Sequence, residues 1–234
     1  MHKGSGLATA GLLALACLGV LAAASAWMGS RAEASPDPND RIASKSPCPV
    51  DWDYWLAVNP DIVAWIEIPG TAISQPVAQA PPDDPEFYLT HDVRREWNLY
   101  GCPYVDAECA SGVDSPSVVI SGHNIDTPPA MFHEIAEFHD PEFLADHREV
   151  VLYTPHDTKH LSVIGSKTVP GWTAEKPTRF ATARDFQVWR NGKLAEFGRP
   201  PEDDFGQMVT LCSCSYFDNP SDERTLVYAY RVAA

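Results

Sequence analysis

Three residues of this chain have the right types and positions to carry out acyl transfer together. Cys214 ends an apolar β-type run, and Arg224 begins the next such run after a turn at 218–221. His123 follows the compact apolar run 117–121 and a glycine. A thiolate beside an imidazole can attack a carbonyl carbon and hold the acyl group as a thioester, while the imidazole protonates the leaving amine. A guanidinium can hydrogen-bond the oxyanion of the tetrahedral intermediate.

Each of these residues has an ordinary structural explanation when it is taken alone. Cys214 could be a small buried apolar residue, His123 a structural hydrogen-bond donor and Arg224 a surface charge. Their joint placement at strand ends and starts favours the chemistry instead, because scaffolds present functional groups at such positions.

Short β-strands and a few helices must position these residues. Apolar periodicity and turn residues predict strands at 62–68, 72–77, 117–121, 149–153, 159–166, 208–214 and 225–230, with short β-like pieces at 87–89 and 103–105. The segments expected to be helical are 51–59, a stretch opened by Pro128 and Pro129, 140–147, and 182–197 with a capping box at Thr182 and Asp185. About seven or eight strands with one late helix favour a mainly β fold, a closed or nearly closed barrel.

The composition limits the classes of partner and site. The chain has 234 residues, 44% of them hydrophobic, and a net charge of −15, which argues against nucleic acid as a partner. No Cys-x-x-Cys pair occurs among the six cysteines, and the histidines show no metal-site spacing, so we expect no metal and no cofactor. Cys102 and Cys109 flank a short loop, which leaves two possibilities open, a disulfide or two free buried thiols.

The N-terminal region predicts that the protein is targeted to a membrane. Residues 6–28 form an uncharged apolar run that is long enough to cross a bilayer as a helix. We favour a retained anchor over residues 1–29, although the small residues at 22–26 also allow a cleaved signal peptide. Residues 30–49 read as a linker and 50–234 as the catalytic domain. The expected location is the cell membrane, single-pass, with the catalytic domain extracellular.

The motifs together resemble the sortase family, and most closely class B sortases. The strand Thr210-Leu211-Cys212-Ser213-Cys214 is similar to the family's Thr-Leu-x-Thr-Cys, with Ser213 in place of the second Thr. The resemblance therefore aligns Cys214 with the nucleophile, His123 in its Gly-His context with the catalytic histidine, and Arg224 with the catalytic arginine. The segment 59–70 and the late helix also fit class B, and the resemblance covers about residues 50 to 232.

The resemblance implies a fold, an activity and partners. The fold would be the eight-stranded sortase β-barrel, with an inserted helix before its last hairpin. The enzyme would cut the C-terminal sorting signal of secreted proteins, form a thioester on Cys214 and pass the acyl group to a cell-wall (peptidoglycan) precursor amine or a pilin lysine. The residues expected to bind substrate are Thr210, Leu211, Cys212, Ser213 and Asn124. A cysteine hydrolase without transfer, or a non-catalytic surface module, remains the alternative.

Cys212 departs from the family pattern. Because side chains alternate along a strand, Cys212 and Cys214 should point to the same face. Cys212 is either a small residue that fills its position or a partner for reversible oxidation with Cys214, although a Cys-x-Cys disulfide is strained.

Overall fold

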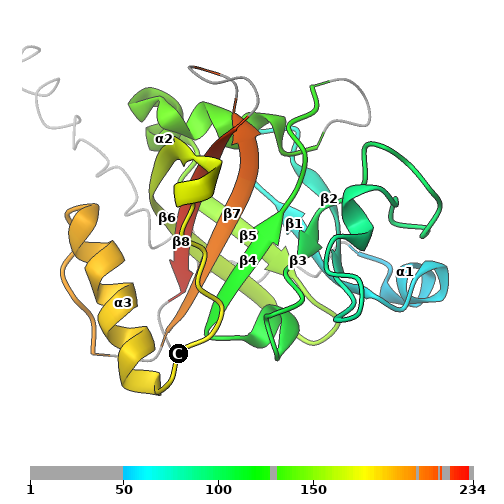
Figure 1. The fold of residues 1–234 in the computed structure, drawn as a ribbon, viewed down its shortest axis with the longest axis horizontal. Coiled ribbons are helices and arrows are strands. Elements are labelled where there is room, and N and C mark those ends of the chain that lie inside the picture. The colour runs from blue at the N-terminus through cyan, green and yellow to red at the C-terminus, as the bar shows by residue number, and fades with distance from the viewer. Residues whose placement is uncertain (1–49, 127–130, 204–205, 216, 218–221, 232–234) are drawn as a thin grey trace, which may run out of the picture. The chain divides into compact units, whose positions relative to one another are not determined.

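Eight strands close into one barrel, in the order β1-β2-β3-β4-β7-β8-β6-β5 (Figure 1). The structure, a computed structural model, describes residues 50–126, 131–203, 206–215, 217 and 222–231. The strands are β1 (Ile62–Glu67), β2 (Ser74–Gln79), β3 (Tyr104–Val105), β4 (Ser117–Ser121), β5 (Glu149–Tyr153), β6 (Thr158–Pro170), β7 (Gln207–Ser215) and β8 (Glu223–Arg231). The predicted mainly β, eight-stranded barrel is therefore confirmed.

The helices are short, apart from one. They are α1 (Trp52–Val58), α2 (Pro141–Asp146) and α3 (Ala183–Glu196), with 3-10 helices η1 (Phe87–Leu89), η2 (Gly112–Asp114), η3 (Phe132–His139) and η4 (Gly171–Thr173). The predicted helix after residues 128–129 is the 3-10 helix η3, and it buries Phe132, Ile135 and Phe138. Residues 128 and 129 themselves lie outside the described part of the chain.

The strands β7 and β8 are buried on both faces. Leu211 and Val227 belong to the barrel core, whereas Cys212 and Leu226 belong to a second apolar cluster on the outer face. That second cluster includes Phe186 and Leu194 of α3. The near-continuous apolar sequence of this hairpin follows from burial on two faces.

The helix α3 is fixed at its start and along its buried side. The Oγ1 of Thr182 accepts a hydrogen bond from the Asp185 N–H, which is the N-cap bond of the predicted capping box. The Asp185 carboxylate accepts from the Thr182 hydroxyl. Arg190 is fully buried, and its guanidinium donates to the carbonyls of Gly206 and Glu202 at 2.9 and 3.1 Å. These two bonds tie the helix to the segment that leads into β7.

The open question of Cys102 and Cys109 is answered by the structure. Both are free, buried thiols, and they pack into different apolar clusters. The Cys109 thiol donates to the carbonyl of Ser117 at 3.7 Å, and burial raises its pKa to about 11. The possible disulfide is therefore not present, because each thiol is held in its own apolar surroundings.

The N-terminal predictions lie outside the described residues. The anchor expected at 1–29 and the linker at 30–49 therefore stay predictions, as does the division of the chain at residue 50. Within the ranges that the structure describes, no helix has both the length and the apolar character needed to span a bilayer.

Candidate active site

Cys214 and Arg224 lie directly opposite each other on neighbouring strands. They are Cα partners in the antiparallel β7–β8 ladder, next to the pair Ser215 and Glu223. Residues that pair in this way carry their side chains on the same face of the sheet. This is the outer face, because alternation places Cys214 with Cys212 and Arg224 with Leu226, two members of the outer cluster. Both side chains are half-buried, so a substrate can reach them.

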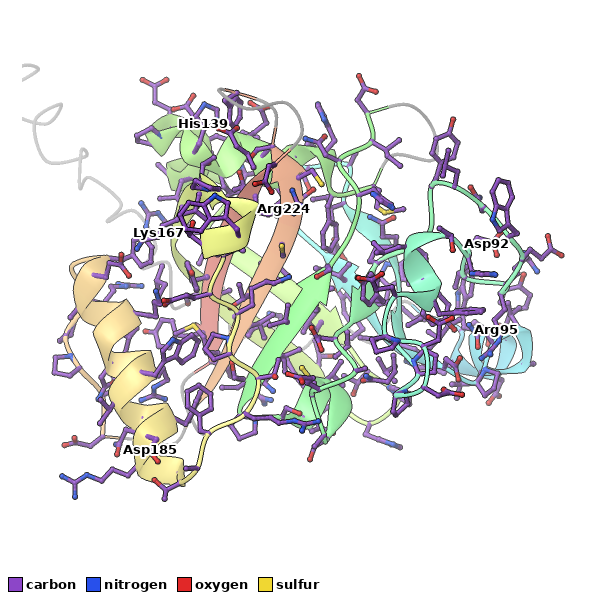
Figure 2. The ribbon with its side chains drawn as sticks, in the orientation of Figure 1. Asp92, Arg95, His139, Lys167, Asp185 and Arg224 are labelled. Carbon is purple, nitrogen blue, oxygen red and sulfur yellow. The ribbon has the colours of Figure 1, made fainter. Side chains whose placement is uncertain are left out.

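Arg224 lies at the end of the barrel where the strand β7 finishes. Figure 2 shows it at the same end as His139 of η3. Its Nη1 donates to the carbonyl of Glu223 at 2.8 Å, and its other neighbour across the sheet is Val169 of β6. The Arg224 backbone thus lies between Cys214 of β7 and Val169 of β6, and its guanidinium bonds the main chain of β8.

His123 reaches this end of the barrel from β4, which pairs in parallel with β7. The strand β4 ends at Ser121, whose Cα partner is Cys212. The His123 Nε2 lies 3.0 Å from the carbonyl oxygen of Leu89. Because a carbonyl only accepts, Nε2 carries the hydrogen. The ring's other nitrogen, Nδ1, has no hydrogen-bond partner among the described residues and can exchange a proton.

Asn124 joins the histidine segment to the cysteine strand. Its Nδ2 donates to the carbonyl oxygen of Cys214 at 2.9 Å, and its Oδ1 lies 2.7 Å from Nδ1 of His133. His123 and Cys214 are therefore connected through Asn124, the neighbour of His123 in sequence.

Cys212 is covered, unlike Cys214. It is 4% exposed, and burial raises the pKa of its thiol, although the positive charges of Lys176 and Arg224 oppose this effect. Lys176 lies in the segment between η4 and α3, which crosses the outer face. The next residue, Pro177, accepts a hydrogen bond at its carbonyl from the Ser117 hydroxyl. Strand geometry separates the Cα atoms of residues two apart by about 6.6 Å, the upper end of the range for a disulfide. A Cys212–Cys214 disulfide would therefore lie at the long limit of disulfide geometry, as expected for a strained Cys-x-Cys bridge.

The other predicted substrate-binding residues are buried in β7. Thr210 and Leu211 are at most 1% exposed, and so is Ser213. Leu211 packs inside the barrel, and alternation directs Ser213 to the same inner face. The structure gives these residues a supporting position beneath the site, and their contact with a substrate stays a prediction.

Two loops border the outer face beside Cys214 and Arg224. Gly171, at the start of η4, donates its N–H to the carbonyl of Asp222 at 2.6 Å. The Glu223 carboxylate accepts from the Phe217 N–H at 3.0 Å, and the Phe217 ring packs on His139 at 4.2 Å. Trp172, the residue after Gly171, is 82% exposed.

A family model for the sortase domain matches residues 66–232. That range contains the whole barrel except residues 62–65 of β1, and it includes Cys214, Arg224 and His123. The chain belongs to the sortase family.

The solved structures that resemble this sortase include several class B sortases. Clostridium perfringens sortase B is 25% identical with a TM-score of 0.64, covering 77% of this chain and 99% of that one. Bacillus anthracis sortase B is 23% identical with a TM-score of 0.65, covering 78% and 82% of the two chains. A Staphylococcus aureus sortase B–substrate complex is 19% identical with a TM-score of 0.64, covering 78% and 84%. The last two likenesses concern the fold.

Among curated proteins, Listeria monocytogenes sortase B is similar to this sortase over part of its length. The two are 29% identical over 90 residues, which is 38% of this chain and 35% of the relative. The match thus spans about a third of that relative's own length. This match alone does not assign the activity or the partners of the relative to this chain.

Three features of this sortase's site could not be detected from sequence patterns. The Leu89 carbonyl that orients His123 is a main-chain atom from a loop far away in sequence. Lys176 lies in a loop without a motif, and His133 is one of several histidines whose spacing indicates no site, which suits a surface or hydrogen-bonding residue. Only the fold brings these groups next to His123, Cys212 and Asn124. Among the described residues, no group of three metal-ligating side chains could hold an ion.

Proposed function

We propose that this sortase is a cysteine transpeptidase with Cys214 as nucleophile, His123 as acid and base, and Arg224 as oxyanion donor. The observation that carries the proposal is the direct pairing of Cys214 with Arg224, with the His123 segment joined to Cys214 through Asn124. The three residues come from β7, β8 and the segment directly after β4, three neighbouring parts of the barrel, which supports a joint role.

The geometry supports a two-step acyl transfer. The Cys214 thiolate attacks the carbonyl carbon of a peptide bond, and the oxyanion that forms accepts hydrogen bonds from Arg224. The C–N bond then breaks as His123 gives a proton to the leaving amine, which leaves a thioester on Cys214. In the second step an acceptor amine attacks the thioester and His123 removes its proton. The amide product leaves, and the Cys214 thiolate is restored.

The hydrogen bond to Leu89 supports the proton-transfer role of His123. Since Nε2–H is directed at a carbonyl, the neutral ring keeps its lone pair on Nδ1. The imidazolium form can donate from Nδ1 while the bond to Leu89 stays in place. The ring can therefore cycle between both protonation states without turning.

The substrate and acceptor are proposed from the family. The substrate would be the C-terminal sorting signal of a secreted protein, and the acceptor a peptidoglycan precursor amine or a pilin lysine. We further propose that residues 1–29 anchor the enzyme in the cell membrane with its catalytic domain outside. Anchoring would hold the enzyme near a membrane-bound substrate and a lipid-linked acceptor, which raises their effective concentration.

Transfer is tested against hydrolysis by supplying an acceptor. A library of sorting-type peptides is incubated with the full chain, with and without an amine, and the products are identified by mass spectrometry. Transpeptidation predicts a peptide–amine conjugate that requires both Cys214 and the amine. Release of the free acid only, at a rate that the amine does not change, would show a hydrolase instead.

A further inference from the structure

The β4–β7 ladder ends before it reaches Cys214. The last paired residues are Ser121 and Cys212, and Gly122 adds one more bond by donating its N–H to the Cys212 carbonyl at 3.1 Å. Two residues further along β7, the carbonyl of Cys214 points to the same side. No main-chain N–H of β4 remains to meet it, because the strand has ended.

The Asn124 side chain takes the place of that missing donor. Its Nδ2 bonds to the Cys214 carbonyl at 2.9 Å. Because this carbonyl can only accept, the amide group has one possible orientation, with Oδ1 directed at Nδ1 of His133 at 2.7 Å. Oδ1 in turn only accepts, so His133 carries its hydrogen on Nδ1. The two hydrogen bonds therefore run in one direction, from His133 to Asn124 and from Asn124 to Cys214.

The rest of the turn is braced by the segment that carries His133. The N–H of Phe132 donates to the His123 carbonyl at 3.1 Å, and the N–H of His123 lies 3.2 Å from the Met131 sulfur. The helix η3, which contains His133, also packs against β7 and β8. His133 thus approaches Asn124 from an element that is itself fixed to the cysteine strand.

We infer that Asn124 and His133 are positioning residues that hold the Cys214 peptide for attack, an inference that rests on the proposed function. Asn124 supplies the hydrogen-bond donor that β4 no longer provides to Cys214. His133 fixes the orientation of the Asn124 amide, with Nδ2 toward the Cys214 carbonyl. Neither touches a reacting atom. The Cys214 thiol is the group whose placement they set, and misplacing an attacking atom by about 1 Å can cost about 10²-fold in rate.

This role differs in its kinetics from the substrate contact that the sequence predicted for Asn124. A substrate contact would raise KM when it is lost, whereas a positioning role lowers kcat and leaves KM nearly unchanged. A merely structural role would lower the melting temperature without lowering the kcat of the folded enzyme.

The test measures kcat and KM for peptide cleavage, together with melting temperature, in Asn124 and His133 variants of the full chain. We expect Asn124→Ala to lower kcat about tenfold to a hundredfold, with KM within about twofold. Asn124→Asp should lose as much, because a carboxylate still accepts from His133 but cannot donate to the Cys214 carbonyl. His133→Leu should lose less, and His133→Gln should recover most of the activity because its amide N–H can replace Nδ1–H.

The two residues should also act as one unit. If His133 acts only through Asn124, the kcat of the double variant Asn124→Ala, His133→Leu equals that of Asn124→Ala alone. His160→Leu is the matched control, since His160 also bonds one side chain, Glu149 at 2.7 Å, but on the β5–β6 hairpin. It should keep the full kcat.

Two outcomes would overturn the inference. One is a wild-type kcat in Asn124→Ala, and the other is a rise in KM that accounts for the whole loss. Failure of the proposed function is distinguishable, because wild-type enzyme would then form no thioester on Cys214 and the variant series would have no activity to compare.

Discussion

At the residue scale, the proposed chemistry depends on the pairing of Cys214 with Arg224. The two are Cα partners across β7 and β8, so both side chains leave the same face of the sheet at neighbouring positions. Sequence patterns identified both residues and His123. They could not show the Leu89 carbonyl or the orientation of Asn124, because such contacts depend on segments brought together only by the fold.

Arg224→Ala should lower kcat by about 10² to 10³-fold, because it removes the proposed oxyanion donor. Arg224→Lys keeps the charge but not the planar guanidinium and should recover only part of the rate. Steady-state cleavage of a sorting-type peptide measures both effects. Arg231→Ala, at the other end of β8, is the matched control, and equal losses in the two alanine variants would contradict the assignment.

At the element scale, α3 packs on the outer face of the sheet through a close contact with β6. A Cβ atom added at Gly165 would lie 2.1 Å from the ring of Phe197, the residue that caps the end of α3. The register of β6 against β8 also shifts between Val163 and Gly165. The sequence predicted both elements, but not this contact, since a glycine within a strand gives no indication of which side chain covers it.

Gly165→Ala should lower the free energy of unfolding by about 1 to 3 kcal/mol, because the Phe197 ring must move. Urea unfolding of the single variant, of Phe197→Leu and of the double variant measures the coupling between the two residues. The double variant should recover part of the loss. Full additivity would contradict a direct clash.

Gly192→Ala is the matched control for this series. Gly192 lies within α3, and a Cβ added there meets nothing within 4 Å. This change should raise the free energy of unfolding by about 0.5 to 1 kcal/mol, since alanine favours a helix more than glycine does.

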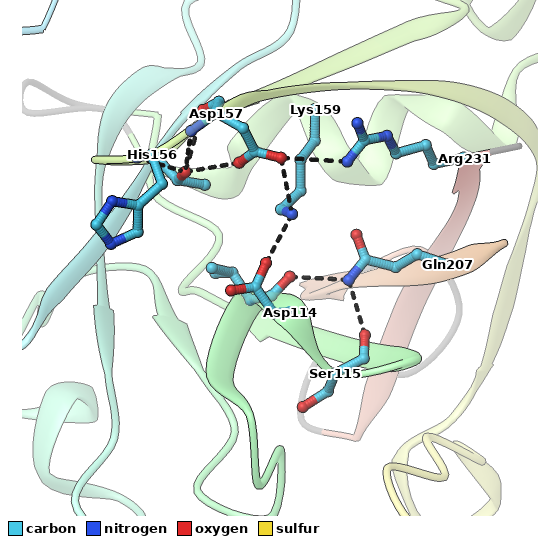
Figure 3. Close-up of polar contacts among 9 residues, drawn as sticks. Asp114, Ser115, His156, Asp157, Lys159, Gln207 and Arg231 are labelled. Carbon is cyan, nitrogen blue, oxygen red and sulfur yellow. Dashed lines mark hydrogen bonds and ion pairs between the residues drawn. The ribbon is translucent and has the colours of Figure 1, made fainter. Parts of the chain in front are cut away.

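At the scale of the whole barrel, the two ends differ in the side chains that they carry. The end where β7 finishes carries the proposed site, and the end where β7 begins is closed by a polar network (Figure 3). There the buried Lys159 ammonium donates to Asp114 at 2.7 Å and Asp157 at 3.2 Å, and Arg231 donates to Asp157 at 3.3 Å. Gln207, the first residue of β7, donates to the carbonyl of Ser115 at 2.7 Å.

The sequence predicted the barrel at this scale because strand number and turn positions follow from local patterns. It did not predict this polar closure. Lys159, Asp114 and Arg231 are far apart in the chain, and each one alone reads as a surface charge.

Asp157→Asn should lower the free energy of unfolding by about 1 kcal/mol near neutral pH. Burial alone would raise the pKa of Asp157, but hydrogen bonds from Thr154, Lys159 and Arg231 outweigh it and lower the pKa below its usual value. A lowered pKa in the folded state stabilises the protein above the carboxyl's ordinary pKa, and this stability is lost as the pH falls through the folded-state value. The difference between wild type and variant should therefore be constant above about pH 5 and shrink in stronger acid.

Chemical denaturation across that pH range checks this expectation. The exposed Asp83 provides a control, and Asp83→Asn should change the stability little at any pH. A wild-type advantage over Asp157→Asn that grows as the pH falls would contradict the sign derived from the Asp157 network.

The most direct test of the central claim is the intact mass of the enzyme after incubation with a sorting-type peptide and no added amine. We predict a thioester adduct with the mass of the N-terminal peptide fragment, located on Cys214 by digestion and released by hydroxylamine. The adduct should be absent in Cys214→Ala and present in Cys212→Ala. An adduct on Cys212, or none with any peptide of a sorting-signal library, would contradict the account.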